Sequence, residues 1–244
     1  MQDKIIVITG GATGIGFSIA KELIKGNTVI SVDRSPSKIE ALKAALPAVH
    51  SIKADITSDY GLNMAIASIG NDFGRIDVLI NNAGRGGPFD IVAMSEEELM
   101  KNVDAEMAVN YRAPIVFTKK ALPLLKKSPK PVVVINSSGL AYVPIARLGS
   151  YCASKTAVHF ITMCIRHQLQ PLNIRVVEVL PPNVDTELNM SKGVKKMSAD
   201  EFTRIFLKKL ENGENVINVG QSSALEKFSR LFPGFAFKML NKSR

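Results

Sequence analysis

Short apolar runs alternate along the chain with longer stretches in which apolar residues recur at helical spacing. The apolar runs predict strands at residues 4–9, 28–32, 48–53, 76–80, 131–136, 173–180 and 215–219. Helical spacing predicts a helix directly after residue 16, others at 37–45, 95–127 and 199–211, and one that carries Tyr151 and runs to about residue 169. Strands that alternate with helices in this way are typical of an α/β protein with a parallel sheet.

The 244 residues are expected to form a single domain. The apolar fraction of 46% supports a sizeable core, and no Pro/Gly/Ser-rich linker or internal repeat interrupts the alternation of elements. Residues 187–197 lack a strand or strong helix pattern, and we expect them to form a mobile loop over the site. A basic and apolar tail, residues 221–244, ends the chain.

The apolar runs are far shorter than the ~20 residues that cross a bilayer, so we expect a soluble, cytoplasmic protein. Cys152 and Cys164 lie in one predicted helix, too far apart to bridge each other, and reduced thiols fit the cytosol. The histidines His50, His159 and His167 show no ligand spacing, so no metal site is expected.

The net charge of +9 raises the question of an anionic partner. Lysine pairs are scattered over several elements without interleaved aromatic residues, which favours solvated helix faces over a nucleic-acid site. In the tail, five cations accompany a set of large apolar residues: Phe228, Leu231, Phe232, Phe235 and Phe237. Contact with a membrane is one interpretation of the tail, and packing against another subunit is the one we favour.

The first candidate site is a glycine-rich turn. The strand at 4–9 runs into Gly10-Gly11-Ala12-Thr13-Gly14-Ile15-Gly16, and a helical pattern follows at once. Glycines allow a tight turn and a close approach of the backbone to a phosphate, while amides at the helix start face its negative charge. The alternative is a tight turn without a ligand.

Carboxylates follow the next two strands. Asp33 stands at the distance from the glycine turn expected for a residue that hydrogen-bonds an adenosine ribose, and its charge favours NAD over NADP. Arg34 could offset part of that repulsion, so NADP stays an alternative. Asp55 could accept a hydrogen bond from an adenine amino group or serve as a helix cap or turn residue.

Candidate catalytic groups lie further along the chain. Tyr151 and Lys155 are four residues apart on one helical face, where the ammonium is expected to lower the phenol's pKa and make it an acid/base. Ser138 follows an apolar strand, at the edge where open α/β sheets hold ligands. Asn110 is a poor helix former inside a helical pattern, which suggests a role for its amide.

These residues together resemble the short-chain dehydrogenase/reductase family over nearly the whole chain. The family's motifs match Thr9 to Gly16, Asn81-Asn82-Ala83-Gly84, and the tetrad Asn110, Ser138, Tyr151 and Lys155. The resemblance implies a Rossmann-type doubly wound sheet of about seven parallel strands with helices on both faces. It also implies a homodimer or homotetramer. The segments PPNVDTEL and PGFAFKMLN are further similar to oxidoreductases of D-alanyl-teichoic-acid operons.

By the same resemblance, Tyr151 is the general acid/base, and Lys155 lowers its pKa and binds the nicotinamide ribose. Ser138 positions the substrate oxygen, and Asn110 holds a water that relays protons from Lys155. The implied cofactor contacts are Gly10, Thr13, Gly14, Ile15, Gly16, Asp33, Arg34, Asp55, Ile56, Asn82, Ala83, Gly84, Tyr151, Lys155, Pro181, Val184 and Thr186. One departure is Pro182, which stands where the family usually has glycine and stiffens the backbone beside the nicotinamide.

The expected activity is hydride transfer between a nicotinamide cofactor, NAD or possibly NADP, and a small alcohol or carbonyl substrate. The candidate substrate contacts are Arg85, Leu140, Tyr142 and Arg147, and the two arginines would suit an anionic substrate. The alternative is a dinucleotide-binding or sensing protein without catalysis.

Overall fold

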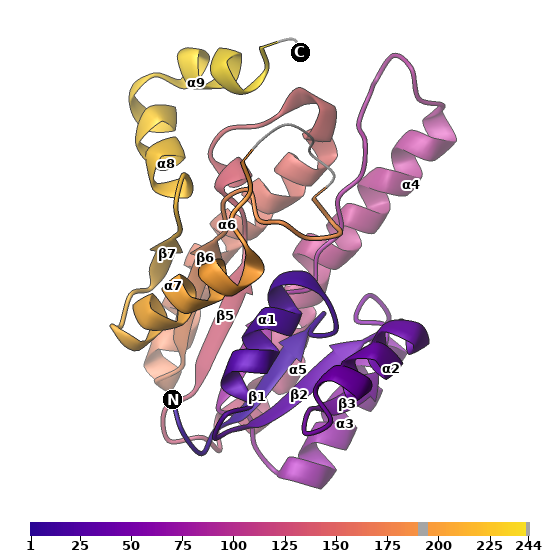
Figure 1. The fold of residues 1–244 in the computed structure, drawn as a ribbon, viewed down its shortest axis with the longest axis vertical. Coiled ribbons are helices and arrows are strands. Elements are labelled where there is room, and N and C mark those ends of the chain that lie inside the picture. The colour runs from indigo at the N-terminus through magenta and orange to yellow at the C-terminus, as the bar shows by residue number, and fades with distance from the viewer. Residues whose placement is uncertain (190–194, 243–244) are drawn as a thin grey trace.

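A computed structural model describes residues 1–189 and 195–242. Over these residues, seven parallel strands form one sheet in the order β3-β2-β1-β4-β5-β6-β7, with helices on both faces (Figure 1). The strands are β1 (Ile5–Thr9), β2 (Thr28–Asp33), β3 (His50–Lys53), β4 (Val78–Asn81), β5 (Val132–Asn136), β6 (Arg175–Leu180) and β7 (Val216–Asn218). The helices are α1 (Gly14–Leu23), α2 (Pro36–Ala45), α3 (Asp59–Phe73), α4 (Glu96–Met107), α5 (Ala113–Leu125), α6 (Gly149–Leu169), α7 (Ala199–Glu211), α8 (Ser222–Leu231) and α9 (Pro233–Leu240).

The expected fold class is confirmed, and the strands begin and end close to the predicted residues. Our expectations from sequence do not include α3, α8 or α9. Glycines at 61 and 70 dilute the apolar pattern of α3, and the large apolar side chains of the tail helices lie on their exposed sides. The sequence of α8 is nonetheless strongly amphipathic, so a helix could have been predicted there from its apolar spacing.

Alternate side chains of the buried strands pack into two apolar layers, one on each face of the sheet. Ile6 and Ile8 of β1 point into a layer shared with α1, α2 and α7. Val7, between them, points into the opposite layer, which is shared with α3, α5 and α6. A parallel sheet covered on both faces requires this continuous apolar character, which explains why the strands read as short uninterrupted apolar runs.

The helical region predicted at 95–127 is interrupted. It begins with a capping box, in which the side chains of Ser95 and Glu98 satisfy each other's backbone amides. Between α4 and α5 lies a π-helical turn, Ala108–Arg112, which contains Asn110. Such turns occur often at functional sites, because they displace a side chain from regular helical spacing.

Part of the loop expected at 187–197 lies outside the described residues, which exclude 190–194. On its described side, Met197 pairs with Val184 in an isolated parallel bridge. No helix among residues 1–189 and 195–242 is long and apolar enough to cross a membrane.

Asp77, just before β4, joins three parts of the fold. Its carboxylate is 1% exposed and accepts hydrogen bonds from the Ile5 amide at 2.9 Å, from Arg75 and from the Ser128 hydroxyl. Burial alone would raise the pKa of Asp77, but these donors outweigh burial and hold the pKa below its usual value.

Asp77→Asn should therefore lower the free energy of unfolding at pH 7 by about 1.5–3 kcal/mol, because buried donors lose a charged acceptor. The folded pKa is depressed, so the contribution is present above the usual value of 3.8 and is lost as pH falls through the folded pKa. Urea unfolding at pH 7 and pH 3 measures this: the free energy of unfolding should differ less between the two pH values in the variant than in the wild type. Equal pH dependence, or an equal loss in the exposed variant Asp104→Asn, would contradict this role.

Candidate functional site

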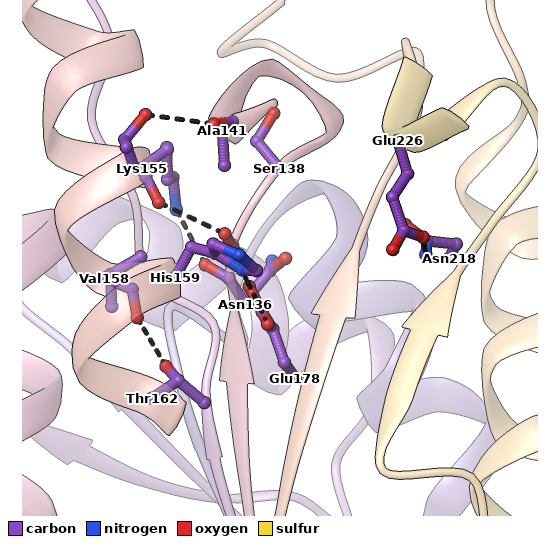
Figure 2. Close-up of polar contacts among 12 residues, drawn as sticks. Asn136, Ser138, Ala141, Lys155, Val158, His159, Thr162, Glu178, Asn218 and Glu226 are labelled. Atoms are coloured by element: carbon purple, nitrogen blue, oxygen red, sulfur yellow. Dashed lines mark hydrogen bonds and ion pairs between the residues drawn. The ribbon is translucent and has the colours of Figure 1, made fainter. Parts of the chain in front are cut away.

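Tyr151, Lys155 and Ser138 lie together at the carboxyl edge of the sheet. Tyr151 and Lys155 project from α6, and Ser138 follows β5 with its hydroxyl within hydrogen-bonding reach of the Tyr151 phenol. The Lys155 ammonium lies 5.8 Å from the centre of the Tyr151 ring and donates to the Asn136 carbonyl at 2.8 Å. Figure 2 shows Lys155 reaching from α6 to Asn136 below Ser138.

The expected lowering of the Tyr151 pKa is wrong for this geometry. Burial raises the pKa of Tyr151 to about 12, and the Ser138 hydrogen bond only partly opposes it. The Lys155 ammonium is directed at the Asn136 carbonyl, and its own pKa falls to about 8 because it is buried. At neutral pH the phenol is therefore neutral and the ammonium is charged, which makes Tyr151 a proton donor before it is a base.

Asn110 connects the π-helical turn to α6 and to the segment after β4. Its amide nitrogen donates to the Arg85 carbonyl at 2.8 Å and to the Ser154 hydroxyl at 2.9 Å, while its oxygen accepts from the Arg85 amide at 2.9 Å. These bonds occupy both amide protons of the side chain. Asn110 thus positions the chain around the site, and the water relay expected from the resemblance stays a prediction.

The glycine turn has the shape of a phosphate cradle. Gly10 and Gly14 adopt left-handed backbone angles, with φ of +66° and +57°, and a Cβ at Gly16 would collide with the Gly10 carbonyl oxygen. Thr13 is the N-cap of α1 but makes no side-chain capping bond. The first amides of α1 therefore have no side-chain acceptor, which suits an anionic ligand.

Asn82 holds this turn against the neighbouring strands. Its side-chain nitrogen donates to the carbonyls of Thr9 and Gly10, each at 3.1 Å, and its oxygen accepts from the Asn136 amide at 3.0 Å. The Thr9 hydroxyl accepts from the amides of Asn82 and Ala83. Because the Asn136 carbonyl also accepts a hydrogen bond from the Lys155 ammonium, one chain of polar contacts runs from the glycine turn to Lys155.

Asp33 faces the glycine turn from the end of β2. Its carboxylate accepts from the Ala12 amide at 3.1 Å and from the Ser31 hydroxyl. Burial raises the pKa of Asp33 despite these donors. Arg34, beside it, is exposed.

Asp55 forms the turn that leads into α3. Its carboxylate accepts from the Thr57 amide at 2.9 Å and from the Thr57 hydroxyl at 2.7 Å. Burial alone would raise the pKa of Asp55, but the Thr57 bonds and the charge of Arg34 together lower it. Asp55 is thus the turn residue that the sequence offered as an alternative, and its adenine contact remains a prediction. The cofactor contact of Ile56, which is partly buried beside it, also remains a prediction.

The segment after β6 lies over the glycine turn. A Cβ at Gly14 would meet the Thr186 methyl at 3.1 Å, and one at Gly84 would meet Leu188 at 3.8 Å. The Pro181 carbonyl accepts from the Gly139 amide at 3.1 Å, and Val184 is buried. Thr186 therefore lies beside Gly14, and its contact to a cofactor stays a prediction. Ile15 packs against the apolar layer shared by α1, α2 and α7.

The expected substrate residues have different contacts in the structure, and their role toward a substrate stays a prediction. The Leu140 amide donates a hydrogen bond to the Ser138 hydroxyl at 3.1 Å. Arg147 is exposed. Arg85 is bound through its backbone to Asn110, and its charge lowers the pKa of Glu106 against a stronger effect of burial. Tyr142 packs edge-on against His159, with the ring centroids 5.3 Å apart.

Sequence reasoning missed two neighbours of Lys155, Glu178 and His159. Glu178 in β6 is fully buried, and both of its oxygens lie about 3 Å from Nδ1 of His159 on α6. Its hydrogen bond raises the pKa of His159, and its charge also raises the pKa of Lys155 against the stronger effect of burial. Figure 2 shows the pair below Lys155. A charged residue inside the apolar run RVVEVL was the available signal.

Within the part of the chain that the structure describes, no group of three or more His, Cys, Asp or Glu side chains could hold a metal ion.

Comparison with known proteins places this geometry in context. A family model described as short chain dehydrogenase matches residues 4–197. The uncharacterized oxidoreductase DltE of Bacillus subtilis is 32% identical over 99% of this chain and 98% of its own length. The match thus extends through the tail, in agreement with the resemblance noted for its sequence.

Solved structures share the same fold. A short chain dehydrogenase from Burkholderia cenocepacia in complex with NADP is 26% identical, with a TM-score of 0.85 and 98% of each chain covered. A 3-ketoacyl-(acyl-carrier-protein) reductase from Brucella melitensis complexed with NADH is 27% identical, with a TM-score of 0.81, and covers 91% of this chain and 99% of that one.

Glu178→Gln should lower the pKa of Lys155 further below about 8, because a buried charge that favours the ammonium is removed. The pKa of His159 should fall as well, because its main partner becomes neutral. Carbon-13 NMR titration of labelled lysine and histidine side chains measures both. An unchanged Lys155 titration would contradict this coupling, and the surface variant Glu214→Gln, the matched control, should leave both values alone.

Proposed function

Because this chain belongs to the short-chain dehydrogenase family, we propose that it interconverts a small alcohol and the corresponding carbonyl compound with a nicotinamide cofactor. One observation carries the proposal: a neutral phenol, a hydroxyl and a buried ammonium share the carboxyl edge of the sheet with the glycine turn. Solved relatives carry NADP or NADH by their own descriptions, which supports a cofactor of this class.

The residues of the glycine turn fit a dinucleotide. The free first amides of α1 would receive the pyrophosphate, and Asp33 would accept hydrogen bonds from the adenosine ribose. Thr186, above the turn, would lie near the carboxamide of the nicotinamide. When bound, the nicotinamide supplies or accepts the hydride.

Tyr151 would move the proton of the reaction. With a pKa of about 12 the phenol is protonated at pH 7 and can donate to the oxygen of a carbonyl substrate as negative charge develops there. Ser138, hydrogen-bonded near the phenol, would hold the same oxygen. The Lys155 ammonium would bind the nicotinamide ribose, and this contact would weaken as pH rises through about 8 and the ammonium loses its proton.

Tyr151→Phe should lower kcat at least about a thousandfold, because no other acid stands at the substrate oxygen, and it should leave cofactor affinity nearly unchanged. Turnover of a panel of alcohols and carbonyls, followed by the absorbance of the reduced nicotinamide, measures the first effect, and cofactor titration by fluorescence measures the second. Tyr60→Phe, at an exposed position, is the matched control and should behave as wild type. Full activity of the Tyr151 variant would refute the assignment.

NAD should be preferred to NADP, because the Asp33 carboxylate would face a 2′-phosphate. Asp33→Asn keeps an oxygen for the Ala12 amide but removes the charge, so the ratio of kcat/KM for NAD to that for NADP should fall about tenfold or more. Steady-state kinetics with each cofactor gives the ratio, and Asp104→Asn should not change it. A wild-type preference for NADP, or an unaltered ratio in the Asp33 variant, would count against this role.

Self-association through α4 and α6 is also part of the proposal. Exposed apolar side chains on these helices, including Met100, Phe160 and Met163, would be covered in a homodimer or homotetramer. Sedimentation equilibrium of the full chain should give two or four times 26.5 kDa. A monomeric mass at working concentration would reject it.

A further inference from the structure

The tail helices α8 and α9 pack on the segment between β5 and α6 and lie apart from the sheet (Figure 1). Ser222 at the start of α8 contacts Gly139, where a Cβ would approach its hydroxyl to 2.6 Å. Past α9, the Asn241 side chain accepts from the Ala146 amide at 2.6 Å and donates to the Pro144 carbonyl at 3.0 Å. The two helices are therefore anchored at both ends, and their outer sides have a defined orientation.

The outer sides of these helices carry large apolar side chains. Leu231 is 71% exposed and Phe235 is 61% exposed, although burial of either side chain would be favourable. We call the whole set the tail surface: Phe228, Leu231, Phe232, Phe235, Phe237 and Met239, each at least 41% exposed. So many large exposed apolar side chains on two consecutive helices indicate a surface that binds a partner or a membrane.

Positive charge predominates among the tail residues. Lys227, Arg230, Lys238 and Lys242 are all exposed. Residues 221–242 contain a single acid, Glu226, which is partly buried and already engaged by the Asn218 amide at 2.7 Å and by Arg230 at 3.0 Å. Figure 2 shows Glu226 of α8 turned toward Asn218 of β7. The side that faces outward is therefore apolar and cationic.

The combination of apolar and cationic side chains discriminates between two binding partners, a second copy of the chain and a membrane. A second copy of the chain, joined by a two-fold axis, would bring the same cations of both copies together around the apolar centre, and the single acid of residues 221–242, Glu226, is already engaged by Arg230 and Asn218. An anionic bilayer satisfies both features, since phenyl and leucyl side chains enter the boundary of the acyl chains while lysines and arginine meet lipid headgroups. We propose that the tail surface docks the protein on an anionic membrane. The structure thereby favours the membrane interpretation over the subunit packing that the sequence alone suggested.

Co-sedimentation of the full chain with lipid vesicles tests the proposal and requires no turnover, so its outcome is independent of the proposed activity. Vesicles of phosphatidylcholine mixed with phosphatidylglycerol should bind the protein at least about tenfold more tightly than vesicles of phosphatidylcholine alone, and high salt should reduce that difference. The double variant Leu231→Ser/Phe235→Ser should weaken binding about tenfold or more. Lys227→Gln/Lys238→Gln should remove most of the preference for anionic lipid.

The matched control is Ile91→Ser/Val92→Ser, which removes two exposed apolar side chains outside the tail surface and should leave vesicle binding unchanged. The proposal fails if the wild-type chain does not bind anionic vesicles, if it binds neutral vesicles equally well, or if the tail variants bind as tightly as wild type. Sedimentation velocity without lipid adds one further outcome. A smaller mass for Leu231→Ser/Phe235→Ser than for wild type would assign the tail surface to a second copy and overturn the proposal.

Discussion

The site depends on the burial of one cation. Lys155 is 3% exposed, and its ammonium is stabilised by the Asn136 carbonyl and by the negative charge of Glu178. An ammonium without such partners would lose its proton inside the fold. Because Asn136 also binds Asn82, and Asn82 binds the glycine turn, the contact that stabilises the ammonium joins the proposed catalytic and nucleotide-binding parts of the site.

The parallel sheet makes this junction possible. Strands β1, β4 and β5 are neighbours that run in the same direction, so the glycine turn, the Asn82 segment and Ser138 all emerge at one edge. The π-helical turn then brings Asn110 to Ser154 of α6, which fixes the helix that carries Tyr151 and Lys155. Residues distant in sequence are thus positioned by strand order and by a few polar bonds.

Sequence reasoning was most reliable where local pattern determines structure. The apolar runs located the strands, and the glycine spacing located a turn that needs positive φ at Gly10 and Gly14. It was less reliable where tertiary packing decides. The pKa of Tyr151 depends on its burial, and the orientation of Tyr142 depends on His159, so neither follows from residue spacing.

A titration of Tyr151 tests the central claim most directly, because the account requires a neutral phenol beside a charged ammonium. Carbon-13 NMR of tyrosines labelled at Cζ, with Tyr151→Phe used for assignment, follows the ionisation of this side chain in the full-length protein. The account predicts that Tyr151 keeps the signal of a neutral phenol well above pH 10, while Lys155 loses its proton near pH 8. Ionisation of Tyr151 below its ordinary value of 10 would contradict it.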